Sequence, residues 1–264
     1  MLDSSGRRIH YLRVSVTDRC NLRCVYCMPP QGVPFVPHDR ILSLERIALV
    51  ARAAAALGFD KVRLTGGEPL ARKGVAELVS MLADIPGLAT IGMTTNGSLL
   101  APLASELARR GLSSVNVSLD TLDAGRFSEL TRGGRLSDTL EGIRAARAAG
   151  LPVKLNVVTS DHAQADLEDV RAFAEREGCA VQTIRQYRLD EEKFDDERYE
   201  RPSPCAACDR IRLLATGELK PCLHGDDAVP VDFSDIEGSI RACVALKPPC
   251  GTRARDHLVS AIGG

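Results

Sequence analysis

The amino-acid sequence predicts an α/β fold, a partial (β/α)6 barrel of the TIM type followed by a small C-terminal extension. Short apolar runs alternate six times with longer segments of helical period. Such alternation favours right-handed βα units around a parallel sheet. The chain has 264 residues, enough for one large domain with a substantial core.

The expected elements follow from the apolar pattern and from residues typical of helix ends. Six strands are expected at Tyr11–Val16, Lys61–Leu64, Thr90–Thr94, Ser114–Leu119, Val153–Val158 and Val181–Arg185. Five helices are expected at Ser43–Leu57, Gly74–Asp84, Leu99–Arg110, Asp138–Ala149 and Leu167–Glu177. Gly58, Gly111 and Gly150 follow helices where a left-handed residue is favoured, and Asp138 with Glu141 fits a capping box.

The pattern changes after Arg185, where a polar and acidic stretch leads to a tail that contains cysteines. We therefore expect two domains, the barrel in residues 1–189 and the C-terminal extension in residues 190–264. A net charge of −1 with 26% charged residues does not indicate nucleic-acid or membrane binding. The chain shows neither a signal peptide nor a bilayer-spanning run, so a cytoplasmic protein is expected. In that compartment its nine cysteines stay reduced, and clustered thiols more often hold metal than form disulfides.

Unusual sequences come where the predicted strands end. TDRCNLRC follows the first strand, TGGEP the second and TTNG the third, and SLD closes the fourth. In barrels of this type the chemistry takes place on the loops at the carboxyl ends of the strands. The sequence therefore predicts one active site at that end of the barrel.

Cys20, Cys24 and Cys27 have the spacing C-x3-C-x2-C. Three thiolates on one loop can hold three irons of a cubane [4Fe–4S] cluster and leave the fourth iron open to a small molecule. From the spacing alone, a zinc site completed by a distant histidine, or a reduced loop, is the alternative.

A second set, Cys205, Cys208 and Cys222, has the spacing C-x2-C-x13-C. Because His224 lies two residues further on, zinc with three cysteines and one histidine and an iron–sulfur cluster are equally open. Arg210 and Arg212 alternate within the same segment, a fork suited to phosphate oxygens. The remaining cysteines are expected to be buried or incidental thiols: Cys179, Cys243 and Cys250.

Two features resemble the radical S-adenosylmethionine (SAM) superfamily: Tyr26 immediately before the last cysteine, and the turn Gly66–Pro69 one βα unit after the cysteine loop. In that superfamily SAM chelates the open iron, and an electron passed through the cluster cleaves SAM to a 5′-deoxyadenosyl radical. More specifically, the chain resembles the molybdenum cofactor biosynthesis protein A family of GTP 3′,8-cyclases. The segments that carry this resemblance are LRVSVTDRCNLRCVYCMP, VRLTGGEPLARKG, TTNGSLL, SSVNVSLDTLD, GLPVKLNVV, CDRIRLLATGELKPCL and SAIGG.

The resemblance implies SAM and two [4Fe–4S] clusters as cofactors and GTP as substrate. The radical takes a hydrogen from ribose C3′, and the sugar radical attacks guanine C8, while the second cluster binds the purine. The product, (8S)-3′,8-cyclo-7,8-dihydroguanosine 5′-triphosphate, belongs to molybdenum cofactor biosynthesis. A reducing electron donor and a downstream pterin-forming enzyme are the further partners expected.

Site residues follow from the same resemblance. The expected SAM contacts are Tyr26, Gly66, Gly67, Glu68 and Ser118. The expected GTP contacts are Arg13, Arg63, Thr94, Lys154, Arg210 and Arg212, to which Arg185 is added because it ends the sixth strand. These cations suit a triphosphate of about −4 charge. Lys154, inside an apolar strand, is expected to need a charged partner. Gly263 and Gly264 are expected to reach into the site and assist catalysis.

The chain departs from the family pattern after the sixth strand, where only Gln186–Pro204 precedes the second cysteine set and Asp190 takes the place of a SAM-contacting methionine. The cavity wall is then thinner, or a second subunit of a homodimer supplies it. Two other hypotheses stay open here. One is a radical SAM enzyme with an auxiliary cluster that acts on another purine nucleotide or a peptide. The other is a non-catalytic zinc or nucleotide-binding protein.

Overall fold

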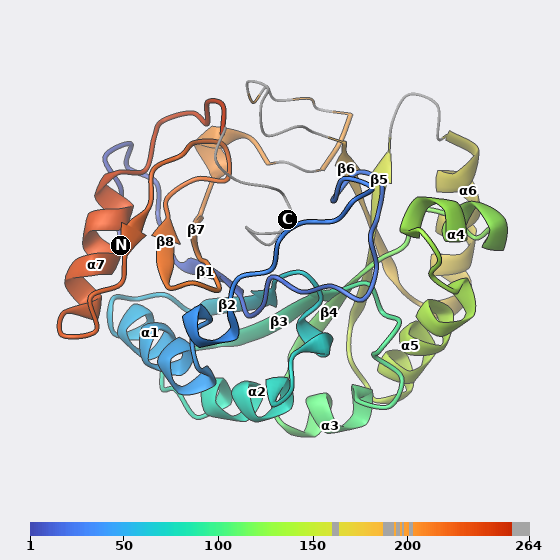
Figure 1. The fold of residues 1–264 in the computed structure, drawn as a ribbon, viewed down its shortest axis with the longest axis horizontal. Helices are drawn as coiled ribbons and strands as arrows, with labels where there is room; N and C mark the ends of the chain where they lie inside the picture. Colours follow the sequence, from blue (N-terminus) through green and yellow to red (C-terminus); the bar gives the residue numbers. More distant parts are fainter. Residues whose placement is uncertain (160–163, 187–192, 194–195, 197, 201–202, 255–264) are drawn as a thin grey trace.

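A computed structural model describes residues 1–159, 164–186, 193, 196, 198–200 and 203–254. A curved sheet forms the inner layer, and α1 to α6 form an outer arc around it (Figure 1). The strands are β1 Tyr11–Ser15, β2 Lys61–Thr65, β3 Thr90–Thr95, β4 Ser114–Ser118, β5 Val153–Thr159, β6 Ala180–Arg185, β7 Arg210–Leu213, β8 Glu218–Lys220 and β9 Val229–Pro230. The helices are α1 Leu44–Ala56, α2 Val75–Ala83, α3 Ala104–Arg109, α4 Ala124–Thr131, α5 Leu136–Ala148, α6 Gln164–Glu177 and α7 Ile236–Ala245.

The sheet has the strand order β6-β5-β4-β3-β2-β1-β7-β8-β9. Strands β1 to β7 pair in parallel, whereas β8 and β9 are antiparallel. In the part of the chain that the structure describes, β6 and β9 are not paired with each other, so the barrel is open. The predicted fold class, an α/β partial barrel, is confirmed.

Apolar burial between the sheet and its helices explains why these segments form these elements. Helix α1 buries Ile47, Val50, Ala51 and Ala54, the spacing of one helical face. Each Ile or Val side chain buried in this way contributes about 1.5–3 kcal/mol relative to exposure. The helix begins after Ser43, whose hydroxyl accepts a hydrogen bond from the Arg46 N–H at 3.2 Å.

The predicted strands lie within one residue of the observed ones, and Gly58, Gly111 and Gly150 have the expected positive φ angles of 86°, 102° and 80°. The predicted capping box was wrong. Helix α5 begins after Arg135, and Asp138 lies in its first turn, where the carboxylate accepts from Arg135 Nε at 3.0 Å.

Helix α3 was predicted to begin at Leu99 but begins at Ala104. Helices α4 and α7 and strands β7 to β9 were not predicted. The C-terminal part adds to the same sheet, because β7 pairs with β1, and α7 packs against α1. The predicted domain boundary between residues 189 and 190 lies outside the described residues and stays a prediction.

Candidate functional site

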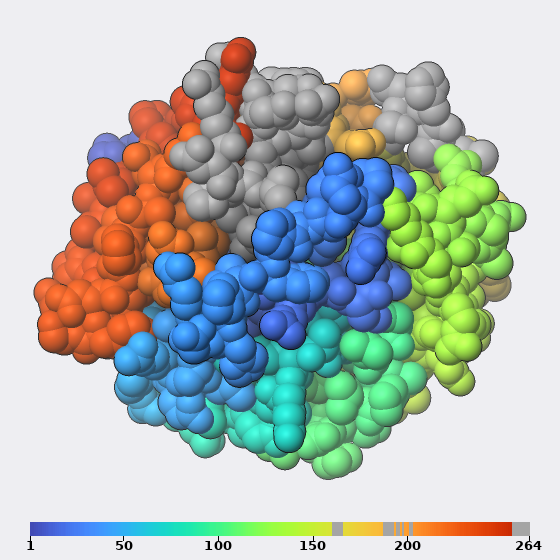
Figure 2. Space-filling model, in the orientation of Figure 1, coloured from blue at the N-terminus to red at the C-terminus, as the bar shows by residue number. Residues whose placement is uncertain are grey.

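A cavity of about 380 Å³ lies against the inner face of the sheet. It is lined by side chains from strands β1 to β7 and from the cysteine loop after β1. Its volume falls in the usual range for small-molecule sites. On the surface shown in Figure 2, blue residues from the N-terminal part lie between the orange C-terminal part and the green helices.

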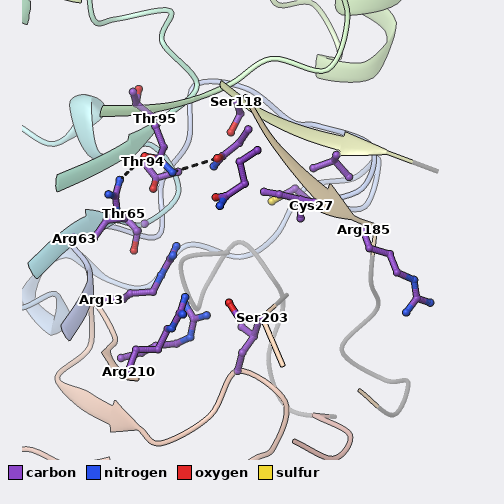
Figure 3. A pocket seen from close by; sticks show the side chains of 18 of the residues that line it. Arg13, Cys27, Arg63, Thr65, Thr94, Thr95, Ser118, Arg185, Ser203 and Arg210 are labelled. Carbon is purple, nitrogen blue, oxygen red and sulfur yellow. Dashed lines mark hydrogen bonds between the residues drawn. The ribbon is translucent and has the colours of Figure 1, made fainter. Parts of the chain in front are cut away.

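The parallel register aligns three arginines in neighbouring strands. Arg13 in β1 is paired with Arg63 in β2 on one side and with Arg212 in β7 on the other. We call these residues the arginine row. Register partners in a parallel sheet point to the same face, so all three side chains face the cavity that they line. Figure 3 shows Arg13 and Arg63 in this cavity.

Strand β3 continues this row with Gly92, the register partner of Arg63. A Cβ atom built at Gly92 would lie 2.7 Å from Arg63 Nη2 and 2.8 Å from Arg63 Cζ. Only glycine leaves room there for the guanidinium to lie over β3.

Neutral acceptors fix the Arg63 guanidinium. Its Nε donates to Tyr11 Oη at 3.0 Å, and its Nη1 donates to Met93 O and to Asn116 Oδ1, both at 2.9 Å. Arg63 is buried, and among the described residues it forms no ion pair with a carboxylate. A buried cation held only by neutral groups attracts an anionic ligand.

Tyr11 lies in a second row of the same register, between Arg210 and Lys61. The Arg210 guanidinium lies 5.2 Å and the Lys61 ammonium 4.7 Å from the centre of the Tyr11 ring, both within cation–π range. Burial acts to raise the pKa of Tyr11, but the charges of Arg13, Arg63 and their neighbours outweigh it and lower that pKa. The potential in this part of the cavity is therefore strongly positive.

Lys154 continues a parallel row formed by Thr94 in β3 and Asn116 in β4. The partner expected for Lys154 is not found, because no ion pair or hydrogen bond of its ammonium occurs within the described ranges. Its side chain instead lines the cavity. Arg185 also lines the cavity, but Figure 3 shows its side chain extending away from the arginine row.

The TGGEP turn is bonded to the first cysteine loop. Gly67 N–H donates to Thr17 O, and Glu68 N–H donates to Arg19 O, each at 2.8 Å. A Cβ atom at Gly67 would lie 2.3 Å from Arg19 O and 2.9 Å from the Cys20 nitrogen. The glycine thus allows the two backbones to meet, which explains why the two motifs occur together.

Glu68 is 1% exposed and carries three hydrogen bonds. Its carboxylate accepts from Thr95 Oγ1 at 2.7 Å, Asn96 N–H at 2.7 Å and Leu70 N–H at 3.0 Å. Burial raises the pKa of Glu68 to about 7. In the described part of the chain it has no cationic partner, so the site suits a ligand amine.

The first three cysteines line the cavity on one loop and are partly buried. Burial, with the neighbouring thiols as a further cause, raises the pKa of Cys24 to about 12 and that of Cys27 to about 11. Three thiolates are therefore stable together only when a cationic group compensates them, which is the chemistry of a metal-cluster ligand set. Cys20 Sγ additionally accepts from Leu22 N–H at 3.4 Å.

The second set, Cys205, Cys208 and Cys222, faces the same cavity from the C-terminal extension. Lys247 is buried beside it and donates to Arg210 O at 2.8 Å and Pro221 O at 2.7 Å. Burial acts to raise the pKa of Cys208, but the charges and hydrogen bonds of Lys247 and Arg210 together outweigh it and lower that pKa. A thiolate is thus favoured at this position.

His224 is buried next to this set, and burial, followed by the charges of Lys193 and Arg212, lowers its pKa to about 4. Among the described residues, no group of three His, Cys, Asp or Glu side chains is gathered closely enough for a single metal ion. The fit to polynuclear clusters rests on the donor sets, which are two groups of three partly buried thiols on one cavity.

Every predicted site residue that the structure describes lines this cavity, and Gly263, Gly264 and Asp190 lie outside the described residues. The individual roles stay predictions. Sequence reasoning missed other lining residues, namely Tyr11, Lys61, Asn116, Asn156, Gln182, Lys193 and Lys247, whereas His224 was considered as a possible metal ligand. The signal for some of them was present, because Asn116 with Ser118, and Lys154 with Asn156, are polar residues two apart in otherwise apolar strands.

Comparison with protein families matches residues 14–174 to the radical SAM superfamily. A GTP 3′,8-cyclase of Moorella thermoacetica is 41% identical over 291 residues, covering 92% of this chain and 88% of the relative. A GTP 3′,8-cyclase of Thermodesulfovibrio yellowstonii is 39% identical over 322 residues, covering 100% of both. That span exceeds the 264 residues of this chain, so the relative has additional internal segments.

Solved structures show the same fold at low identity. SuiB of Streptococcus suis bound to S-adenosylmethionine has a TM-score of 0.67 and 16% identity, covering 89% of this chain and 68% of that chain. Methylornithine synthase (PylB) has a TM-score of 0.56 and 18% identity, covering 69% and 55%. Over the ranges that the structure describes, no helix is long and apolar enough to cross a membrane.

Proposed function

Because the chain belongs to the radical SAM superfamily and, within it, to the GTP 3′,8-cyclase family, we propose that it converts GTP to (8S)-3′,8-cyclo-7,8-dihydroguanosine 5′-triphosphate. This reaction belongs to molybdenum cofactor biosynthesis. The observation that carries the proposal is the similarity to GTP 3′,8-cyclases over nearly the whole chain. Two sets of three thiols on one cavity with the arginine row agree with it.

The cofactors are SAM and two [4Fe–4S] clusters. Cys20, Cys24 and Cys27 would hold the first cluster, and Cys205, Cys208 and Cys222 would hold the second. When bound, SAM and the first cluster supply the radical that removes the C3′ hydrogen of GTP. Glu68 and the backbone around Gly67 would receive the amino-acid part of SAM, because the buried carboxylate has no other cation nearby among the described residues. Tyr26 and Ser118 line the same cavity and are the further proposed SAM contacts.

The arginine row would bind the triphosphate. Arg63 is already fixed by three hydrogen bonds, so little side-chain entropy is lost when a phosphate oxygen contacts its remaining N–H groups. Each charge-assisted hydrogen bond contributes about 1.5–3 kcal/mol. Lys154 and Arg210 would add to the attraction for a group of about −4 charge. Thr94 and Arg185 are further proposed contacts.

The test is turnover by anaerobically reconstituted protein. Incubation with SAM, a strong reductant and GTP should give 5′-deoxyadenosine and a cyclised nucleotide with the mass of GTP. Parallel reactions with ATP, ITP and a peptide mixture test the other substrate classes. A cyclised product from another nucleotide, with none from GTP, would refute the GTP assignment and leave the radical chemistry intact.

Cys24→Ala should abolish 5′-deoxyadenosine formation, because it removes one ligand of the first cluster. Cys179→Ala, which changes a cysteine outside both sets, serves as the matched control and should behave as the parent. Removal of Gly263 and Gly264 should leave both clusters in place and block cyclisation. Full product formation by the shortened chain would exclude a role for these residues.

Other parts of the proposal follow from the chemistry. The reaction needs a low-potential electron donor, and its product needs a pterin-forming enzyme downstream. A homodimer in which a second copy completes the cavity wall, and a cytoplasmic location, are proposed with it. Analytical ultracentrifugation of the reconstituted protein tests the homodimer, and a monomer that remains fully active would contradict it.

A further inference from the structure

Two thiols of the C-terminal part are in contact across 45 positions of sequence. Cys250 Sγ lies 3.3 Å from Cys205 Sγ. Cys250 was expected to be an incidental thiol, but it is exposed and contacts a predicted ligand of the second cluster. Cys205 lines the cavity, whereas Cys250 is not among the residues that line it. Cys250 therefore approaches Cys205 from outside the site.

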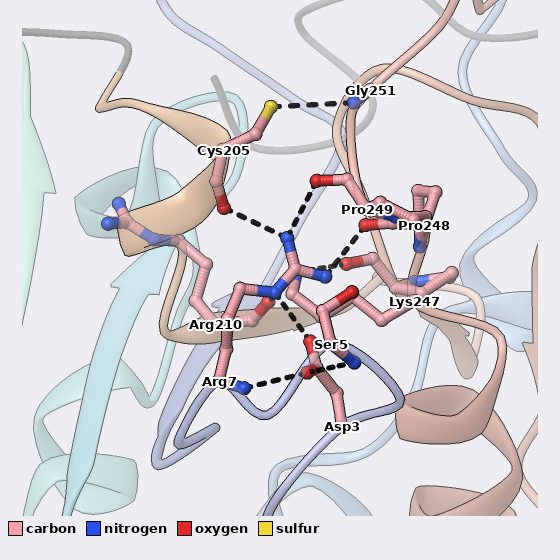
Figure 4. Close-up of polar contacts among 10 residues, drawn as sticks. Asp3, Ser5, Arg7, Cys205, Arg210, Lys247, Pro248, Pro249 and Gly251 are labelled. Carbon is pink, nitrogen blue, oxygen red and sulfur yellow. Dashed lines mark hydrogen bonds and ion pairs between the residues drawn. The ribbon is translucent and has the colours of Figure 1, made fainter.

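Arg7, close to the N-terminus, holds this contact in place. Its guanidinium donates to Cys205 O at 2.8 Å, Pro248 O at 2.7 Å and Pro249 O at 3.0 Å (Figure 4). The side chain is itself fixed by an ion pair with Asp3 at 2.6 Å. One cation thus fastens the segment before Cys250 to the backbone of Cys205.

Gly251 tightens the same junction. Its N–H donates to Cys205 Sγ at 3.4 Å. A Cβ atom at Gly251 would lie 2.7 Å from His224 Cβ and 3.2 Å from Cys222 Sγ, so the backbone passes close to the second cysteine set. The proximity of Cys205 and Cys250 is therefore built by several contacts.

A single-metal site does not account for this pair. Within the residues that the structure describes, no three His, Cys, Asp or Glu side chains are gathered around one ion position. Two thiols in contact, one exposed and one belonging to a cluster ligand set, are instead arranged for thiol–disulfide chemistry.

We propose that Cys205 and Cys250 form a reversible disulfide that competes with the second cluster for Cys205. The oxidant is a low-molecular-weight disulfide. The Cys250 thiolate attacks one of its sulfurs, forming a mixed disulfide and releasing one thiolate. The Cys205 thiolate then attacks the Cys250 sulfur and releases the second thiolate. The two cysteines lose two electrons and two protons in total, and the small disulfide is reduced to two thiols.

The consequence concerns cluster loading. The two sulfurs need to approach only from 3.3 Å to the bond length of about 2.05 Å, so little backbone movement is required. The disulfide removes one of three ligands from the second set, whereas a bound cluster keeps Cys205 as an iron thiolate and blocks the second step. The inference rests on the proposed second cluster but not on GTP as the substrate.

Mapping the bond in the full-length protein tests the first part. Metal-free and cluster-loaded protein are incubated with oxidised glutathione under anaerobic conditions, digested without reduction and analysed by mass spectrometry. Metal-free protein should give the linked Cys205–Cys250 peptides. In cluster-loaded protein, Cys250 should carry glutathione and should not be linked to Cys205. A Cys205–Cys208 link, or glutathione on Cys250 alone in metal-free protein, would overturn the proposal.

Iron uptake tests the competition. After oxidation, reconstitution without added thiol should give the parent about four fewer irons than the about eight expected for two cubanes, and prior dithiothreitol should restore them. Cys250→Ser keeps all three predicted ligands and should take up the full amount after the same oxidation. Cys179→Ser should behave as the parent. Equal iron uptake by the oxidised parent and Cys250→Ser would refute the competition, and neither readout depends on nucleotide turnover.

Discussion

The buried carboxylate of Glu68 makes the stability of the metal-free protein depend on pH in a predictable direction. Burial raises the pKa of Glu68 from 4.5 to about 7 in the folded chain. Between these values the folded state binds more protons than the unfolded state, so stability falls as the pH rises. The favourable contribution of the protonated form is complete below pH 4.5 and is lost as the pH passes about 7.

The size of the effect follows from the same shift. One pKa unit corresponds to about 1.4 kcal/mol, so the change from 4.5 to about 7 amounts to about 3 kcal/mol of unfolding free energy. The 1% exposure of Glu68 makes solvent screening small. Glu68→Gln removes the titration. It also weakens one of the three hydrogen bonds to the carboxylate, which costs about 1–3 kcal/mol at every pH.

The assay is urea unfolding of the metal-free parent and of Glu68→Gln at several pH values from 5 to 8, under reducing conditions. The unfolding free energy of the parent should fall by about 2–3 kcal/mol more than that of the variant across this range. The difference in slope is the readout, because the hydrogen-bond cost cancels from it. Parallel pH profiles for the two proteins would refute the burial of an ionisable carboxylate at this site.

Three further predictions concern the cavity. Gly92→Ala should displace the Arg63 guanidinium and weaken GTP binding at least tenfold, about 1.4 kcal/mol, with unchanged SAM cleavage. Isothermal titration calorimetry measures the GTP affinity, and equal affinity for parent and variant would contradict the prediction. Gly67→Ala should separate the TGGEP turn from the cysteine loop and lower the iron content by about half, because only the first cluster is affected. Full iron content would show that the loop tolerates the methyl group. Lys154→Met should leave the unfolding free energy unchanged or higher but reduce the affinity for GTP about tenfold. The reason is that the ammonium lines the cavity and has no partner within the described residues. Unaltered GTP affinity would exclude a contact between Lys154 and phosphate.

The sequence could predict the six parallel strands β1 to β6 because each is an apolar run that must be buried, a pattern visible within a few residues. All six fall within one residue of the expected positions. It could not predict α4, which is eight residues long and buries only Phe127 and Thr131. The capping box failed because Arg135, not Asp138, precedes the helix. Strands β7 to β9 have two to four residues each and acquire their structure from pairing with β1 and with one another.

The candidate site was predictable as a set of residue types at strand ends, but its internal geometry was not. The contact between Arg63 and Gly92 joins strands β2 and β3. The periodicity of the sequence does not define the register between these two strands. Tyr11 was read only as part of an apolar strand, although Arg210 and Lys61 flank its ring from neighbouring strands. Such rows depend on which strands become neighbours, and the pairing of β1 with β7 brings together residues about 200 positions apart.

That pairing also determines how the two cysteine sets come to share one cavity. The first set follows the carboxyl end of β1, and the second set flanks β7, the parallel neighbour of β1. Arg13 and Arg212 lie at one register position between the sets, so a ligand held by both arginines has a cysteine set on either side.

A substitution that separates β1 from β7 would therefore uncouple radical generation from substrate binding even with all six thiols present. Proline at Ile211, a buried position in β7 whose N–H faces β1, should produce this phenotype, retaining 5′-deoxyadenosine formation without cyclised product. Loss of both activities together would instead mean that the sheet as a whole had failed to form.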